Sequence, residues 1–258
     1  MTFLLNQKTD VMAVLFLIGI IVISYGMWLW AGTVLLLLLI VMKNTNFRFL
    51  ASIFICFLVS LMIYQLINNE IGQYDFQKET RIILNRSLLL IIVTGLYIFH
   101  RLSKKEFFFY HHHPRWSQVI KLPFHTIKLS NLLVVVVVSS GAAFLPFVLQ
   151  KDLLISNSFI VFCILFSLIN ATLEEWIWRG ILLSSLVKYV SASYALIVTS
   201  IGFGLMHLII GIPFILCLFF SLGGFFYGVI VLKTNSLYPS IIFHIVINIG
   251  MVFSGFIL

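Results

Sequence analysis

Long apolar runs, separated by short polar stretches, follow one another along the whole chain. The first run covers residues 11–42 and holds no charged side chain. The later runs cover residues 49–67, 82–99, 132–149, 158–187, 194–211, 213–232 and 237–258. Each is long enough to cross a bilayer as a helix, which takes about 17–25 residues. The pattern predicts an all-α fold, a polytopic transmembrane helix bundle with eight or nine spans.

The first run leaves the number of spans open. One helix over residues 11–42 would be roughly 48 Å long, against a hydrocarbon core of about 30 Å. Gly26, Trp28, Trp30 and Gly32 lie in its middle, and this composition is typical of a turn at the membrane interface. We expect a tight hairpin of two short helices here, and one tilted helix is the alternative. The run 158–187 is also long, so we expect its C-terminal part to kink or to lie along the interface.

The composition agrees with a membrane protein and excludes some partners. The chain is 62% hydrophobic and 9% charged, and its mean hydropathy is +1.15. A soluble domain is about 45–50% apolar and about 25% charged. The net charge of +8 does not indicate nucleic-acid binding, because the basic residues lie in loops between apolar runs, where they orient a membrane protein. We therefore expect the lipid bilayer as a partner, and no nucleic acid.

The basic residues also predict a topology. Residues 101–131 form a long loop with six basic residues and one acidic residue, so the positive-inside rule places this loop in the cytoplasm. Counting outward from it, Lys43, Lys188 and Lys233 fall inside and the acidic stretch 70–79 falls outside. We predict a multi-pass protein of the cell membrane with loop 101–131 cytoplasmic and the C-terminus outside. The charged residues of the loop are Arg101, Lys104, Lys105, Glu106, Arg115, Lys121 and Lys128.

The same loop carries four aromatic residues at positions 107–110, followed by histidines at 111, 112 and 113. Aromatic side chains beside Lys and Arg are typical of a segment that lies on the membrane surface. A metal site is the alternative. Three consecutive histidines cannot all reach one ion from a regular helix or strand, so such a site would require an irregular loop.

One apolar run contains three full charges, at Glu174, Glu175 and Arg179. Each charge costs about 2.5–3.5 kcal/mol at the centre of a membrane helix, and intramembrane ionisable groups indicate a functional site. Glu175 and Arg179 are four residues apart on one helix face, with the acid first, which favours an ion pair. We expect these two to neutralise each other and Glu174 to stay free for chemistry. The structural alternative is a buried ion pair that only fixes helix packing.

Two of the seven histidines, His207 and His244, lie inside apolar runs. Phe203 and Asn248 stand four residues from them, on the same helix faces. Glutamate, histidine and asparagine side chains together can activate a water and stabilise an oxyanion. Counted along the helices at about 1.5 Å per residue, His244 lies near the cytoplasmic face and His207 lies deeper. Either the limits assigned to the run 194–211 are wrong or the helices are staggered, and we expect the limits to be wrong.

Three motifs, each in its own span, share a four-residue spacing: Glu174-Glu175-x-x-x-Arg179, Phe203-x-x-x-His207 and His244-x-x-x-Asn248. In this order they resemble the signature motifs of the CAAX protease and bacteriocin-processing (CPBP, or Abi) family of intramembrane proteases. The resemblance covers roughly residues 158–249. It implies an endopeptidase with its catalytic groups on the C-terminal spans. We accordingly divide the chain into N-terminal transmembrane spans with the basic loop, 1–131, and a CPBP/Abi-like catalytic bundle, 132–258.

The resemblance implies a role for each residue of the motifs. Glu174 matches the catalytic glutamate that polarises the attacking water together with His207. His244 and Asn248 match the pair that steadies the oxyanion. The remaining residues match supporting parts: a structural ion pair, Glu175 with Arg179, and an aromatic that shapes the pocket, Phe203.

The substrate implied is a peptide or a lipidated protein within the membrane. The family includes CAAX prenyl endopeptidases and bacterial membrane proteins of the lysostaphin-resistance type. Its bacterial members are linked to the processing of bacteriocins and signalling peptides and to self-immunity.

Three alternatives stay open. Glu174, His207 and His244 are also a possible zinc ligand set with water as the fourth ligand, although we favour a reaction without a cofactor. Intramembrane acids and histidines also build transporters, but the sequence shows none of the repeated halves common in them. The third alternative is a non-catalytic scaffold or immunity protein.

Overall fold

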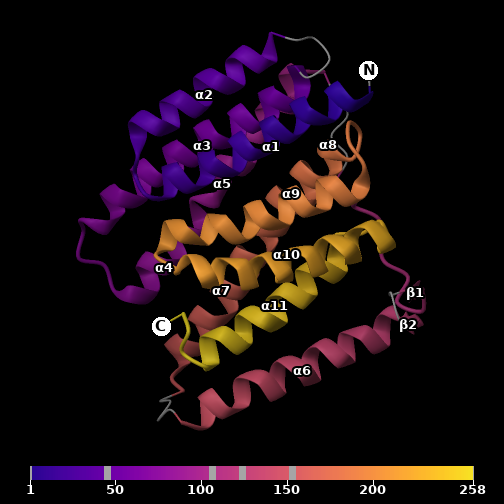
Figure 1. The fold of residues 1–258 in the computed structure, drawn as a ribbon. Helices are drawn as coiled ribbons and strands as arrows, with labels where there is room; N and C mark the ends of the chain where they lie inside the picture. Colours follow the sequence, from indigo (N-terminus) through magenta and orange to yellow (C-terminus); the bar gives the residue numbers. More distant parts are fainter. Residues whose placement is uncertain (1, 44–47, 105–108, 122–125, 151–154, 258) are drawn as a thin grey trace.

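We describe the protein from a computed structural model that covers residues 2–43, 48–104, 109–121, 126–150 and 155–257. Helices dominate, as the apolar runs predict, and they pack side by side in one bundle (Figure 1). The N-terminal half holds five helices and two strands in its described part: α1 (Thr2–Ser24), α2 (Trp28–Met42), α3 (Arg48–Gly72), α4 (Lys78–Ser87), α5 (Leu89–Leu102), β1 (Val119–Lys121) and β2 (Thr126–Lys128).

The C-terminal half holds the helices that carry the three motifs. A π-helical segment, η2, continues α7, and a 3₁₀ segment, η3, continues α9. The elements are α6 (Leu129–Leu149), α7 (Asn157–Glu175), η2 (Trp176–Leu183), α8 (Ser184–Leu186), α9 (Ala192–Leu205), η3 (Met206–Ile210), α10 (Phe214–Thr234) and α11 (Tyr238–Phe253).

The first apolar run is a helical hairpin, as expected, and not one tilted helix. α1 ends at Ser24 and α2 begins at Trp28, and Gly26 between them has φ +68°. Glycine adopts this left-handed conformation without steric cost, so the turn predicted from the sequence forms at Gly26.

Six helical segments of the described chain are long and apolar enough to cross a membrane, judged by length and composition. They are 48–72, 78–102, 129–149, 157–186, 192–210 and 214–234. The helices α2 and α11 are apolar but shorter. The fold is therefore the predicted all-α membrane bundle, and the count of eight or nine spans stays a prediction.

The long run 158–187 forms one helical segment, 157–186, without a break. Its winding changes at Trp176, where α-helix gives way to π-helix, and returns to α-helix at Ser184. The irregularity expected from the length of this run is therefore a change from α-helical to π-helical winding. A π-segment widens the turn and is frequent at functional sites, and this one begins directly after Glu174 and Glu175.

A chain of aromatic contacts joins the two halves of the bundle. The ring of Phe54 on α3 stacks on Phe16 of α1, and Phe57 on α3 contacts the ring of Trp178 in η2 at 5.2 Å. Trp178 is fully buried and meets Phe203 of α9 edge to face. The N-terminal helices therefore pack directly against the elements that carry the motifs.

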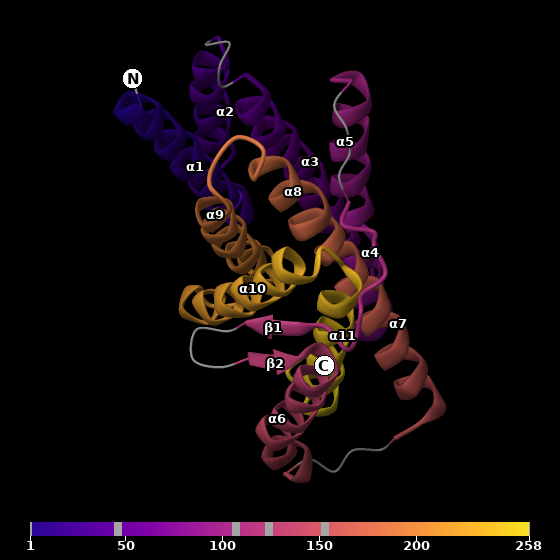
Figure 2. The same cartoon turned by 90° about the vertical axis from the view of Figure 1, so that its right-hand side faces the viewer.

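The basic loop contains structure that the hydrophobic pattern does not predict. Strands β1 and β2 pair antiparallel, with Ile120 opposite Ile127. The ends of α8 and α10 lie on the same side of the bundle as this hairpin (Figures 1 and 2). Lys188 follows α8 and Lys233 lies in the last turn of α10, so basic residues of three segments gather at one end. That this end faces the cytoplasm stays a prediction.

The histidines of the loop pack on the start of α11. His111 forms a β-bridge with Ser236, and the ring of His113 stacks on Tyr238 at 5.2 Å. His112 and His113 line a polar hollow of about 650 Å³. The expected position of this loop on the membrane surface stays a prediction, and residues 107 and 108 of its aromatic run lie outside the described residues.

Candidate active site

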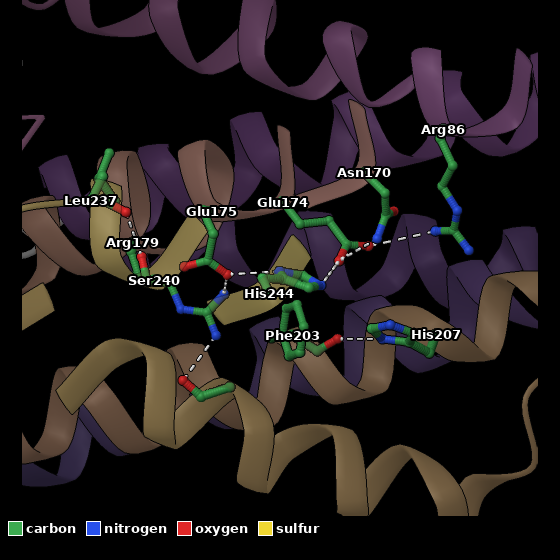
Figure 3. A network of polar contacts seen from close by, with 11 residues as sticks. Arg86, Asn170, Glu174, Glu175, Arg179, Phe203, His207, Leu237, Ser240 and His244 are labelled. Atoms are coloured by element: carbon green, nitrogen blue, oxygen red, sulfur yellow. Dashed lines mark hydrogen bonds and ion pairs between the residues drawn. The ribbon is translucent and has the colours of Figure 1, made fainter. Parts of the chain in front are cut away.

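The residues singled out from the sequence come from three helices that meet in the bundle (Figure 3). Glu174 and Glu175 are the last residues of α7, and Arg179 follows in η2. The other members lie on α9 with η3 and on α11: Phe203, His207, His244 and Asn248. All seven side chains are buried.

Glu175 and Arg179 form the predicted ion pair, with Nη1 of the arginine 2.7 Å from Oε1 of the glutamate. Arg179 Nη2 also donates to the carbonyl of Gly224 at 2.8 Å. The guanidinium lies over the ring of Phe203, 4.5 Å from its centre, and near the ring of Tyr227 at 5.3 Å. A buried charge is tolerated only when it is paired and hydrogen-bonded, and these contacts satisfy the requirement from several sides.

The approach of α10 to Arg179 requires a glycine at position 224. A Cβ added there would stand 2.9 Å from Cδ1 of Phe203 and 3.2 Å from Nη2 of Arg179. Such contacts are shorter than carbon atoms normally accept. Gly224 therefore lets the backbone of α10 come close enough to accept the hydrogen bond from Arg179.

Glu174 is not free of partners, and this corrects the expectation from the sequence. Its Oε1 lies 3.5 Å from Nη1 of Arg86, and its Oε2 lies 3.3 Å from Nδ2 of Asn170 and 3.5 Å from Nε2 of His244. The side chain is fully buried. A carboxylate without water needs donors and a counter-charge, and these come from α4, α7 and α11.

Sequence reasoning missed Arg86 and Asn170, although each left a signal. Arg86 is a charge inside the apolar run 82–99, and the cost argument applied to Glu174 applies equally to it. Asn170 stands four residues before Glu174 on the same helix, so the two share a face. Only the fold shows that Arg86 meets Glu174.

His244 connects the two glutamates. Its Nδ1 lies 3.1 Å from Oε1 of Glu175 and its Nε2 lies 3.5 Å from Oε2 of Glu174. The ring stacks on Tyr227 at 4.9 Å and meets the edge of Phe203 at 5.8 Å. Both ring nitrogens thus face carboxylates, which fixes the orientation of the imidazole.

His207 is oriented by its own helix. Its Nδ1 lies 2.9 Å from the carbonyl oxygen of Phe203 and donates to it, so Nε2 of the neutral ring is a proton acceptor. The ring stacks on Phe220 with centres 4.2 Å apart and planes 8° apart. The 3₁₀ winding of η3 places this histidine after the end of α9.

The expected error in the limits of the run 194–211 did not occur, since the span covers residues 192–210. Phe203 contacts both His207 and His244. Its ring lies one turn before His207, 5.1 Å from the ring of His207 and 5.8 Å from the ring of His244.

One cavity of about 680 Å³ brings most of these groups together. Its polar lining includes Arg86, Asn170, His207, His244 and Asn248. Side chains of α6 and α10 supply apolar walls, among them Val136, Phe144, Phe219 and Leu222. Glu174 lies behind this lining and contacts three of its residues, Arg86, Asn170 and His244.

Asn248 has an unpaired amide nitrogen in the described part of the chain. Its side chain is buried, and its Nδ2 has no hydrogen-bond partner among the described residues. A buried donor without a partner costs free energy. Because Asn248 also lines the cavity, this donor is available to a ligand bound there.

The residues present do not fit a zinc site as they are arranged. Within the described chain, no three His, Cys, Asp or Glu side chains gather so that they could hold a metal ion. We therefore derive no reaction step through a metal.

Comparison with known proteins agrees with the motifs. Residues 156–250 match the model of the Rce1-like family, described as type II CAAX prenyl endopeptidase Rce1-like. This segment is CAAX-protease-like. The match contains all three motifs, so the resemblance inferred from them is confirmed for this part of the chain. No curated protein and no solved structure matched the chain.

Proposed function

We propose that the protein is an intramembrane endopeptidase of the CAAX type, acting on a peptide bond inside or next to the bilayer. The observation that carries the proposal is the meeting of His207, His244 and Asn248 at one membrane cavity, with Glu174 in contact with its lining. The family match of residues 156–250 supports the same reaction class.

In the proposed reaction a water bound in the cavity attacks the carbonyl carbon of the substrate. Glu174 takes one proton of this water, and the Nε2 of His207 accepts a hydrogen bond from its other hydrogen, an arrangement typical of general base catalysis. The peptide C–N bond then breaks, and the proton passes to the departing amine. Glu174 and His207 are thus the groups on which turnover depends most.

We assign the oxyanion to Asn248. Its amide nitrogen is a buried donor without a partner among the described residues and lies on the cavity, and preorganised donors of this kind stabilise the charge that develops in the transition state. The resemblance implies His244 as a second donor. Both nitrogens of His244 face carboxylates, so we give it the role of holding Glu174 and Glu175.

The apolar walls indicate the kind of substrate. A cavity bounded by Val136, Phe144, Phe219 and Leu222 favours an apolar peptide segment or a lipid-modified peptide over a soluble one. We propose substrates that reach the site from the membrane, with loop 101–131 on the cytoplasmic side of the cell membrane. Processing of secreted peptides and self-immunity are physiological roles compatible with this activity.

The test is cleavage by purified protein in liposomes. The substrates are a prenylated peptide ending in Cys-aliphatic-aliphatic-X, the same peptide without the prenyl group, and an apolar transmembrane peptide. Products are identified by mass spectrometry. The matched control for Glu174→Gln is Glu70→Gln, because Glu70 is exposed at the end of α3. Cleavage by wild type and by Glu70→Gln, but not by Glu174→Gln, supports the proposal, whereas equal cleavage by all three refutes it.

A further inference from the structure

Arg86 is a charged side chain buried in a membrane span of the N-terminal half. It lies in the last turn of α4, which continues through Leu88 into α5 as one candidate span, 78–102. The side chain is 9% exposed. Residue 86 lies outside the segment that matches the CAAX protease model, 156–250, so the family resemblance gives it no role.

The surroundings of Arg86 differ from those of Arg179. Arg179 is held by a carboxylate at 2.7 Å, a carbonyl at 2.8 Å and two aromatic rings. Arg86 reaches Glu174 at 3.5 Å, and its Nε has no hydrogen-bond partner among the described residues. Arg86 also lines the cavity. A purely structural ion pair would be expected to satisfy its donors as Arg179 does.

The position of Arg86 is fixed by its neighbours. Asn85 donates from Nδ2 to Oδ1 of Asn68 on α3 at 2.6 Å, which anchors the end of α4. The same helix packs against α7, which carries Glu174. Arg86 therefore approaches the carboxylate of Glu174 from the side opposite to His244 (Figure 3).

The three donors leave one free position on Glu174. A carboxylate has about four acceptor positions, two on each oxygen. Asn170 and His244 face Oε2, and Arg86 faces Oε1. The remaining acceptor position is on Oε1 of Glu174. It lies next to Arg86, which itself lines the cavity.

We infer that Arg86 is a positioning residue that holds Oε1 of Glu174 toward the attacking water. The inference rests on the proposed protease activity and extends it, because it assigns the proton-accepting oxygen and makes the N-terminal half part of the active site. Arg86 acts through Glu174 and not on the substrate.

Steady-state kinetics test this role. Arg86→Gln should lower kcat about 10²-fold, the size expected when a catalytic group is displaced by about 1 Å, and should leave KM within about threefold. Arg86→Lys should recover at least about a tenth of the wild-type kcat, because it restores a charge near Oε1. The control is Arg81→Gln, an exposed arginine of the same helix, which should keep both constants.

A measurement of stability separates the failure of this inference from the failure of the proposed function. Apparent melting temperatures of Arg86→Gln, Glu174→Gln and the double variant form a double-mutant cycle. Each single change leaves a buried charge alone, so the double variant should lose less than the sum of the two. Additive losses of melting temperature would show that Arg86 and Glu174 do not interact. This result can be obtained even if the protein cleaves none of the tested peptides.

Two kinetic results would overturn the positioning role while the protease activity stands. An unchanged kcat in Arg86→Gln would make Arg86 dispensable for the reaction. A raised KM with unchanged kcat would place Arg86 in substrate binding.

Discussion

Glu175 and His244 contact each other across 69 residues of sequence, with Nδ1 of the histidine 3.1 Å from Oε1 of the glutamate. The contact joins the first motif to the third. Because Arg179 binds the same oxygen at 2.7 Å, one carboxylate oxygen orders both the arginine and the imidazole. The supporting pair therefore also positions the ring whose other nitrogen faces Glu174.

Removing the guanidinium of Arg179 should damage folding as well as activity. Arg179→Ala leaves the buried Glu175 carboxylate without its counter-charge, and breaking a buried pair in this way costs about 3–5 kcal/mol. Thermal denaturation of the purified protein in detergent measures the loss. A variant with wild-type stability and no activity would instead assign Arg179 to the chemistry.

Alanine should destabilise the protein at one of two adjacent glycines of α10 and not at the other. Gly224→Ala places a Cβ 2.9 Å from Phe203 and 3.2 Å from Arg179 Nη2, so it should destabilise the protein, typically by about 1–3 kcal/mol. Gly223→Ala is the control, since a Cβ there meets nothing within 4 Å, and helix propensity predicts a neutral or stabilising effect. Equal melting temperatures for the two variants would contradict the close approach of α10 to Arg179.

The side-chain amide of Asn248 should affect the rate far more than the stability. Asn248→Ala removes a donor without a partner among the described residues, so the melting temperature should change little. Loss of one oxyanion donor lowers kcat by about 10²–10³-fold, and a measurable remainder should persist because the attacking water is still activated. A kcat within twofold of wild type would remove Asn248 from the oxyanion site.

Chelation should leave the activity unchanged. The expectation follows from the arrangement of the described residues, in which no three His, Cys, Asp or Glu side chains gather so that they could hold a metal ion. The measurement compares turnover before and after treatment with a strong chelator, together with metal analysis of the protein. Activity that is lost and then restored by zinc would make Glu174, His207 and His244 ligands.

Local features were predictable from the sequence, because their causes lie within a few residues. Gly26 marks the turn between α1 and α2, and the four-residue spacing of Glu175 and Arg179 gives their contact. The burial of Glu174 followed from the apolar run around it.

Contacts between distant segments were not predictable in the same way. Arg86 and Glu174 are 88 residues apart, and only the packing of α4 against α7 brings them together. The role of Gly224 depends on where α10 meets η2. The pairing of β1 with β2 rests on strands too short to give a hydrophobic period.

The central claim is that the protein hydrolyses a peptide bond with a water activated by Glu174 and His207. Single-turnover cleavage tests this claim most directly. Wild type, Glu174→Gln and His207→Ala are reconstituted in liposomes at equal concentrations of folded protein. Each is then mixed with the peptide that wild type cleaves. The account predicts that either variant loses at least about 10²-fold in rate, the usual share of general base catalysis. Cleavage by Glu174→Gln at the wild-type rate would contradict it.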